Sequence, residues 1–169
     1  MYRYLTFALL TLLIPASCAV APLEDGRKAY ERGDYSKAFR RMKPFAEQGD
    51  AKAQFKLGLL YYNGQGVPQD YSEAAKWYRK AAERNVTQAR LSLGMMHYKG
   101  EGVPKDYVLS YMWFGLAASG SRAKEANFRE LAVKGRDLLA PLMTPAQIAK
   151  AEQLAREWKS KAEKEKPPR

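Results

Sequence analysis

A repeat of 36 residues constrains the fold of this chain more than any other feature of its sequence. The segment LGLLYYNGQGVPQDYSEAAKWYRKAA recurs as LGMMHYKGEGVPKDYVLSYMWFGLAA, so that Gly58, Pro68 and Trp77 have counterparts 36 positions later. Rare residue types match in a single register over residues 51–86 and 87–122. A fixed period of this length is typical of a repeat array, in which each unit is a supersecondary motif that buries its apolar face against its neighbours.

The first half of each repeat predicts an amphipathic helix. Ala53, Leu57 and Leu60 recur at helical spacing and form an apolar stripe. Asn63-Gly64 is expected to end this helix, because glycine adopts the left-handed conformation that other residues resist.

The second half of each repeat predicts another helix, which begins after the GxGVP loop. Asp70 is expected to cap it, with Glu73 completing a capping box. Its buried stripe is expected to consist of Ala74, Trp77, Tyr78, Ala81 and Ala82.

The repeat extends towards the N-terminus in a shorter form. Asp34-Tyr35 precedes Asp70-Tyr71 by 36 positions but lacks the glycine loop. We therefore expect an N-terminal unit over residues 22–50, with helices near residues 24–33 and 35–48.

The period fades after residue 122, yet residues 123–158 still predict two helices that cap the array. The sequence from Thr144 to Gln147 is typical of a helix start with a capping box. Residues 159–169 are charged and are expected to form a solvated tail. The apolar stripe of the first helix is expected to contain Phe128, Leu131, Gly135, Leu138 and Leu142. That of the second is expected to contain Ile148, Ala151, Leu154, Ala155 and Trp158.

Residues 1–21 have the pattern of a secretory signal peptide. A basic residue, Arg3, precedes an apolar run that Pro15 ends after about half the length of a membrane span. The sole cysteine, Cys18, stands in the small-residue stretch that follows. Cys18 resembles the lipid acceptor of a bacterial lipoprotein, although Pro15 stands where that pattern prefers leucine. The alternative is ordinary cleavage, with a mature chain that starts near residues 20 to 22.

The pattern LGxxYxxGxGVxxDyxxAxxWyxxAA resembles the Sel-1-like repeat, a relative of the tetratricopeptide repeat. The resemblance covers two full copies, and the N-terminal unit resembles a tetratricopeptide half-match. It implies an all-α fold, an α-α superhelix of about four helix pairs, whose members bind other proteins or components of the cell envelope. Cysteine-rich secreted members differ from this chain, so their activities are not expected here.

Partner-binding residues are expected where the two repeats differ, because the shared residues build the stack. In this superhelical class the first helices line the concave surface. The candidates on that surface are Lys52, Lys56, Leu59, Asn63, Gln88, Ser92, Met95 and Lys99.

Catalytic chemistry has little support in the sequence. One histidine and a single N-terminal cysteine supply neither a metal site nor a cysteine nucleophile, and we expect no cofactor. His97 replaces Tyr61 of the other repeat and is expected to pack as a ring of similar size; the alternative is a proton-sensitive contact. Tyr35, Tyr71 and Tyr107 recur at one repeat position and are expected to be structural.

The sequence therefore predicts an exported, non-enzymatic scaffold that holds a protein partner in the bacterial periplasm or cell envelope. The net charge of +11 leaves open a second class, a binder of cell-wall fragments or anionic lipid, and a cell-wall enzyme is the third. Export argues against nucleic acid, and membrane contact is expected only through a lipid on Cys18.

Overall fold

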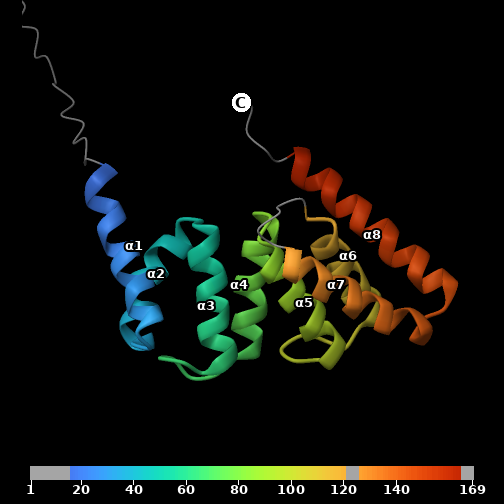
Figure 1. Ribbon diagram of the computed structural model, residues 1–169, viewed down its shortest axis with the longest axis horizontal. Coiled ribbons are helices and arrows are strands. Elements are labelled where there is room, and N and C mark those ends of the chain that lie inside the picture. Colours follow the sequence, from blue (N-terminus) through green and yellow to red (C-terminus); the bar gives the residue numbers. More distant parts are fainter. Residues whose placement is uncertain (1–15, 121–125, 165–169) are drawn as a thin grey trace, which may run out of the picture.

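The computed structural model describes residues 16–120 and 126–164, and their regular structure consists of helices (Figure 1). In chain order the helices are α1 (Ala16–Glu31), α2 (Tyr35–Glu47), α3 (Ala51–Asn63), α4 (Tyr71–Glu83), α5 (Thr87–Lys99), α6 (Tyr107–Ala118), α7 (Ala126–Leu139), the 3-10 helix η2 (Ala140–Leu142) and α8 (Pro145–Lys164).

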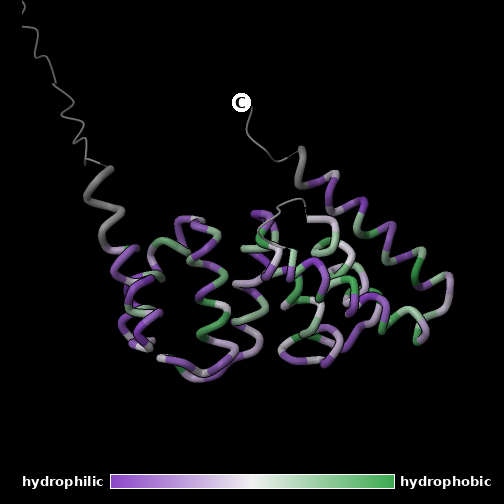
Figure 2. The backbone as a smooth tube through the Cα atoms, in the orientation of Figure 1, coloured by the Kyte–Doolittle hydropathy of each residue, from purple (hydrophilic) through white to green (hydrophobic). Residues whose placement is uncertain are grey.

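The helices stack as pairs along one direction. Helix α1 packs on α2, α3 on α4, and α5 on α6, and each pair is joined to the next through α2–α3, α4–α5 and α6–α7 contacts. The predicted all-α fold of stacked helix pairs is confirmed. Hydrophobic stretches concentrate in the central helices, whereas α1 and α2 are mainly hydrophilic (Figure 2).

Each helix pair buries the stripe that its sequence predicts. Ala53, Leu57 and Leu60 of α3 are almost fully buried, and the alanines and aromatic residues of the predicted α4 stripe are buried with them. Gly64 ends α3 with a φ of 66°, which is the predicted left-handed conformation. Asp70 caps α4 by accepting a hydrogen bond from the Glu73 amide at 2.9 Å.

The predicted capping box at Glu73 is wrong in its second half. The Asp70 amide donates to the carbonyl of Tyr61 instead, at 3.0 Å. The Glu73 carboxylate pairs with Lys76 one turn further along the helix. The loop before α4 therefore satisfies the amide that the glutamate was expected to bind.

The GxGVP loops hold consecutive repeats together. The second glycine of each loop, Gly66 or Gly102, has a positive φ and lies directly against the first residues of a helix in the preceding unit. Gly66 touches the backbone of Tyr35 at the start of α2, and Gly102 touches the backbone of Tyr71 at the start of α4. A Cβ at either glycine would overlap that backbone, so glycine is required here for close approach as well as for its φ.

The N-terminal helix begins earlier than predicted. Helix α1 starts at Ala16, inside the segment expected to be removed, and residues 1–15 of the predicted signal peptide lie outside the described residues, as does the side chain of Cys18. From Leu23 onwards the side chains of α1 pack against α2 and α3. Within the described part of the chain, none of the helices combines the length and apolar character needed to cross a membrane.

The C-terminal unit differs from the prediction in its packing. The expected stripe is wrong for three residues, because Leu131, Leu138 and Leu142 are exposed. The α7 residues that pack inwards are Ala132 and Leu139 instead. Helices α7 and α8 each make their main contacts with α6.

Helix α8 packs through the predicted residues. Ala151 is fully buried, Leu154 and Ala155 pack beside it, and the Trp158 ring meets Trp113 of α6 edge-on with 4.7 Å between ring centroids. The helix continues to Lys164, so part of the expected tail is helical, and the remainder, residues 165–169, lies outside the described residues.

Candidate functional site

The eight candidate residues occupy one side of α3 and α5. Six of them directly precede a residue that is buried in the core, and the other two precede the glycines that end the helices. Residues that share this relation to the core point to the same side of a helix array. We call the surface formed by these eight residues the first-helix face.

The α3 part of the first-helix face is basic. Lys52 is exposed, and no carboxylate of the described residues lies within ion-pair distance of it. The Lys56 ammonium lies over the ring of Tyr30, 3.8 Å from its centroid. Partial burial lowers the pKa of Lys56, an effect that nearby Arg27 adds to and Glu31 opposes.

Two of the eight residues also have structural contacts. Leu59 is half-buried and packs against the central hydrophobic cluster. Ser92 hydrogen-bonds with the side chain of Tyr78, whose own pKa is raised mainly by burial. A partner at this face would therefore touch these two residues only in part.

The α5 part of the face contains the exposed apolar surface. Met95 is 40% exposed, and beside it Tyr98 is 41% exposed. The Tyr98 ring stacks on Tyr107 of α6 with 6.0 Å between ring centroids. Lys99 lies 3.5 Å from Glu101.

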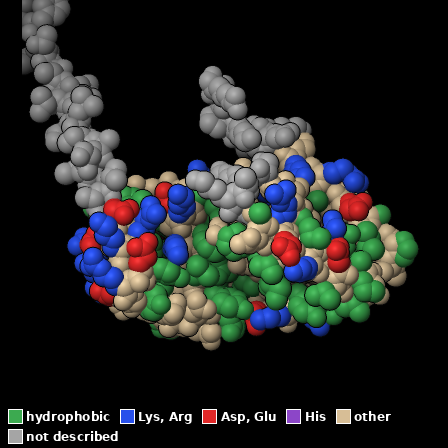
Figure 3. Space-filling view, viewed as in Figure 1, with side chains coloured by type: hydrophobic (Ala, Val, Ile, Leu, Met, Phe, Trp, Pro, Cys, Tyr) green, Lys and Arg blue, Asp and Glu red, His purple; other side chains and the backbone are tan. Residues whose placement is uncertain are grey.

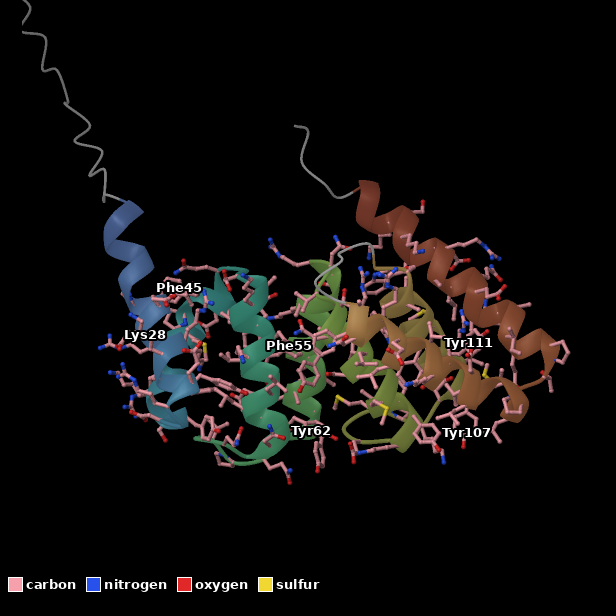
Figure 4. The ribbon with its side chains drawn as sticks, in the orientation of Figure 1. Lys28, Phe45, Phe55, Tyr62, Tyr107 and Tyr111 are labelled. Carbon is pink, nitrogen blue, oxygen red and sulfur yellow. The ribbon has the colours of Figure 1, made fainter. Side chains whose placement is uncertain are left out.

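Sequence reasoning missed Tyr62 and Tyr98, which occupy the same position in the two repeats. The Tyr62 hydroxyl donates to Glu101 of the next repeat at 2.6 Å, and burial together with this carboxylate raises the pKa of Tyr62. Figure 4 places Tyr62 and Tyr107 along the same edge of the array. Both missed tyrosines recur in the repeat and so were assigned to the framework, yet they stand three residues after Leu59 and Met95, one helical turn along the same face.

His97 lies in the core, as predicted. Its side chain is 3% exposed, and Nδ1 lies 3.2 Å from the carbonyl oxygen of Pro104. Nδ1 is thus the donor, and Nε2 is buried without a partner among the described residues. Burial lowers the pKa of His97; the Pro104 hydrogen bond and Asp106 oppose this effect, and Arg79 adds to it.

The described residues contain no group of three or more histidine, cysteine, aspartate or glutamate side chains placed to hold a metal ion. The first-helix face, together with the adjoining Tyr98, is an extended surface. It has the ammonium groups of Lys52 and Lys56 at its α3 end and the exposed side chains of Met95 and Tyr98 on α5. Such a surface is suited to binding through apolar contact and charge pairing.

The sequence profile of the Sel1 repeat matches residues 51–86 and 87–121. The structure is similar to that of a protective antigen present in uropathogenic Escherichia coli strains, which displays an SLR fold; the TM-score is 0.73 and the sequence identity 28%, over 89% of this chain and 33% of that chain. It is also similar to a Sel1 repeat protein from Oxalobacter formigenes, with a TM-score of 0.55 and 23% identity, over 70% of this chain and 56% of that chain. The chain thus spans only part of the length of either. No curated protein matches the sequence.

Proposed function

Because this chain carries two Sel1 repeats, we propose that it is an exported scaffold that binds a protein partner on the first-helix face. Sel1 repeats form helical scaffolds that typically mediate protein–protein interactions. The observation that carries the proposal is the exposure of Met95 and Tyr98 side by side at positions of one helix face. Interfaces are enriched in methionine and aromatic residues at their core, and they have a polar rim in which charged side chains such as lysine can lie.

Binding rather than catalysis fits the chemistry of this face. Its titratable groups are lysines and tyrosines on an open surface, with Glu101 already engaged by Tyr62 and Lys99. A general acid and base pair would need two groups converging on one reacting atom.

Export is the second part of the proposal. Its support is the basic start, the short apolar run and the small residues within residues 1–21. Helix α1 packs from Leu23 onwards, so removal of residues 1–21 would leave those packing contacts in place. The proposed compartment is the periplasm or cell envelope, with attachment through a lipid if Cys18 is the modified residue.

Site-specific photo-cross-linking tests the binding surface. A photoreactive amino acid is introduced in place of Lys52 or Met95 in the full chain, and irradiation is carried out in the organism that makes the protein. We expect a discrete protein adduct from both positions. The matched control is Lys150, which is also exposed but lies on α8. Equal adducts from the control position, or none from Lys52 and Met95, would contradict the proposal.

Mass spectrometry of the protein isolated from its own cells tests export. A start at Cys18 with added lipid mass indicates an anchored protein, and an unmodified start at or after Val20 indicates a released one. An intact Met1 in the cytosolic fraction would refute both forms.

A further inference from the structure

The exposed large hydrophobic side chains of the described residues lie on α5, on α7 and on the short helix η2 that follows α7. Besides Met95 and Tyr98 of α5, they are Leu131 and Leu138 of α7 and Leu142 of η2. The three leucines are exposed by 52%, 73% and 56%, and α5 packs against α7. Single exposed apolar residues are ordinary on protein surfaces, whereas a contiguous group of them marks an interaction surface.

Helix α7 takes the place beside α6 that α5 takes beside α4. Tyr78 of α4 and Phe114 of α6 occupy the same repeat position. Tyr78 bonds to Ser92 of α5, and the Phe114 ring lies against Gly135 of α7, where a Cβ would come within 2.9 Å of the ring. Ser92 and Gly135 are therefore equivalent, but they stand 43 positions apart rather than 36.

On this spacing the exposed leucines continue the first-helix face onto α7. The equivalent pairs are Gln88 and Leu131, Met95 and Leu138, and Lys99 and Leu142. Each leucine also directly precedes a buried residue, as six of the eight face positions of α3 and α5 do; these buried residues are Ala132, Leu139 and Met143. The face therefore covers three helices and has its largest apolar area on the last of them.

The opposite end of the face is cationic. Lys52 and Lys56 have no carboxylate within ion-pair distance among the described residues, whereas Lys134 and Arg136 of α7 are each paired with a carboxylate of their own helix. Figure 3 shows charged side chains gathered over α1 and α2, and hydrophobic ones over the middle of the molecule and its α7 end. The net charge of +11 adds to the attraction for an acidic segment at the α3 end.

We propose that the first-helix face, extended over α7, binds a protein segment in which acidic side chains lie next to a run of apolar side chains. The apolar run covers Leu131, Leu138 and Met95, and the acidic side chains pair with Lys52 and Lys56. This inference rests on the proposed function, since it names the chemistry of the partner at that surface. A lipid surface fits less well, because a membrane-binding helix places unpaired cations beside its apolar side chains.

The test is a selection of random displayed peptides against the purified full chain. We expect the enriched peptides to combine an acidic cluster with an adjoining apolar run. A fluorescein-labelled copy of one such peptide should bind the double variant Leu131→Ser/Leu138→Ser at least tenfold more weakly. The double variant Lys52→Glu/Lys56→Glu should also bind it at least tenfold more weakly and should enrich basic clusters in a repeated selection.

Two controls keep the outcomes distinct. The double variant Lys150→Glu/Lys159→Glu makes the same charge change on α8, away from the face, and should leave peptide affinity unchanged. The leucine variant should keep the melting temperature of the parent, because its changes are at exposed sites. Leu139→Ser, one residue further on, should lower the melting temperature strongly because Leu139 is buried.

The inference fails if no peptide is enriched, if enriched peptides lack either cluster, or if the leucine variant keeps full affinity. It also fails if phosphatidylglycerol vesicles bind the parent chain and lose binding only in the leucine variant, since the face would then be a membrane surface. Photo-cross-links from Lys52 and Met95 that persist when position 138 gives none would leave the proposed function standing and refute the extension over α7.

Discussion

At the scale of single residues, the position shared by Tyr61 and His97 shows how one repeat site accommodates different chemistry. Tyr61 is half-buried and meets Phe39 edge-on, with 5.5 Å between ring centroids. His97 is buried. Its Nδ1 hydrogen-bonds to the Pro104 carbonyl, and its Nε2 is buried without a partner among the described residues. Burial of the ring therefore lowers the pKa of His97 and favours the neutral imidazole over the imidazolium in the folded chain.

We predict that His97 makes the chain less stable in mild acid. The ordinary pKa of histidine is 6.5, and the folded state lowers it mainly through burial. Below pH 6.5 the unfolded state therefore binds more protons, so the free energy of unfolding falls with falling pH until the folded pKa is passed. In His97→Tyr this part of the pH dependence should disappear, as measured by urea unfolding between pH 7.5 and 5.

The control for this prediction is Tyr61→Phe, which leaves all acidic groups and His97 in place. Because both variants keep every carboxylate of the parent, only the difference between the two pH profiles is diagnostic. Parallel profiles for the parent and His97→Tyr would show that folding leaves the pKa of His97 unchanged, which would contradict the prediction.

Helix caps show how far local sequence decides local structure. Thr144 and Gln147 form the predicted box, with the Thr144 amide bound to the glutamine side chain at 2.8 Å and the Gln147 amide bound to the threonine hydroxyl at 3.3 Å. Asp70 and Glu73 have the same spacing and form only half a box. The amide of Asp70 already has a partner in the carbonyl of Tyr61, nine positions earlier on the other side of the GxGVP loop. The sequence predicts the donors and acceptors, and long-range contacts choose between them.

At the scale of elements, the glycine loops set how closely two repeats can approach. Gly102 and Gly33 both have a positive φ, at 67° and 81°. A Cβ on Gly33 would meet no atom within 4 Å, whereas one on Gly102 would overlap the backbone of Tyr71. The two positions thus share the conformational requirement and differ in the space available.

We predict that Gly102→Ala destabilises the chain more than Gly33→Ala. Both variants carry the cost of a left-handed alanine, about 1–2 kcal/mol. Gly102→Ala adds a displacement of the loop from the start of α4, which should cost about 1–3 kcal/mol more. Chemical unfolding of the two variants under the same conditions measures the difference. Equal losses of stability would show that the loop is held only by its own φ angles.

The elements with a clear period were predictable from the sequence, whereas for α7 the presence of the helix was predictable and its buried side was not. The spacing of 43 positions between Ser92 and Gly135 interrupts the register, so no repeat position was available to orient α7. Without a repeat position, the large apolar side chains of the leucines indicate that their side of α7 is the buried one. The side that packs on α6 is instead lined by Ala132 and Gly135, because Phe114 already fills that space. Small residues at a close helix contact carry little hydrophobic signal, and this is why the sequence predicts the exposed stripe of α7 as its buried one.

At the scale of the whole molecule, the chain has 29 lysine and arginine residues and only 18 aspartate and glutamate residues. The ion pairs that the structure shows lie at the surface, where a single pair contributes little. Self-repulsion of the net positive charge should therefore outweigh them.

We predict that the free energy of unfolding rises as NaCl is increased from 10 to 200 mM. Salt screens the repulsion over this range, since the Debye length falls from about 30 Å to below about 10 Å. Urea unfolding at several salt concentrations checks this, with an unchanged dependence on urea as the control. A fall in stability with salt would show that the surface ion pairs dominate.

The seating of Gly102 on Tyr71 has a consequence for how the chain is made. The contact of Gly102 with the start of α4 forms only when residue 102 is in place, and that residue leaves the ribosome 31 positions after Tyr71. The same delay separates Gly66 from Tyr35. The contacts at the starts of α2 and α4 therefore form only after the next repeat has been synthesised. A nascent chain halted within the loop should accordingly leave its last helix pair open to protease. Folding of the array would then proceed from the N-terminus in steps, each step requiring one more glycine loop.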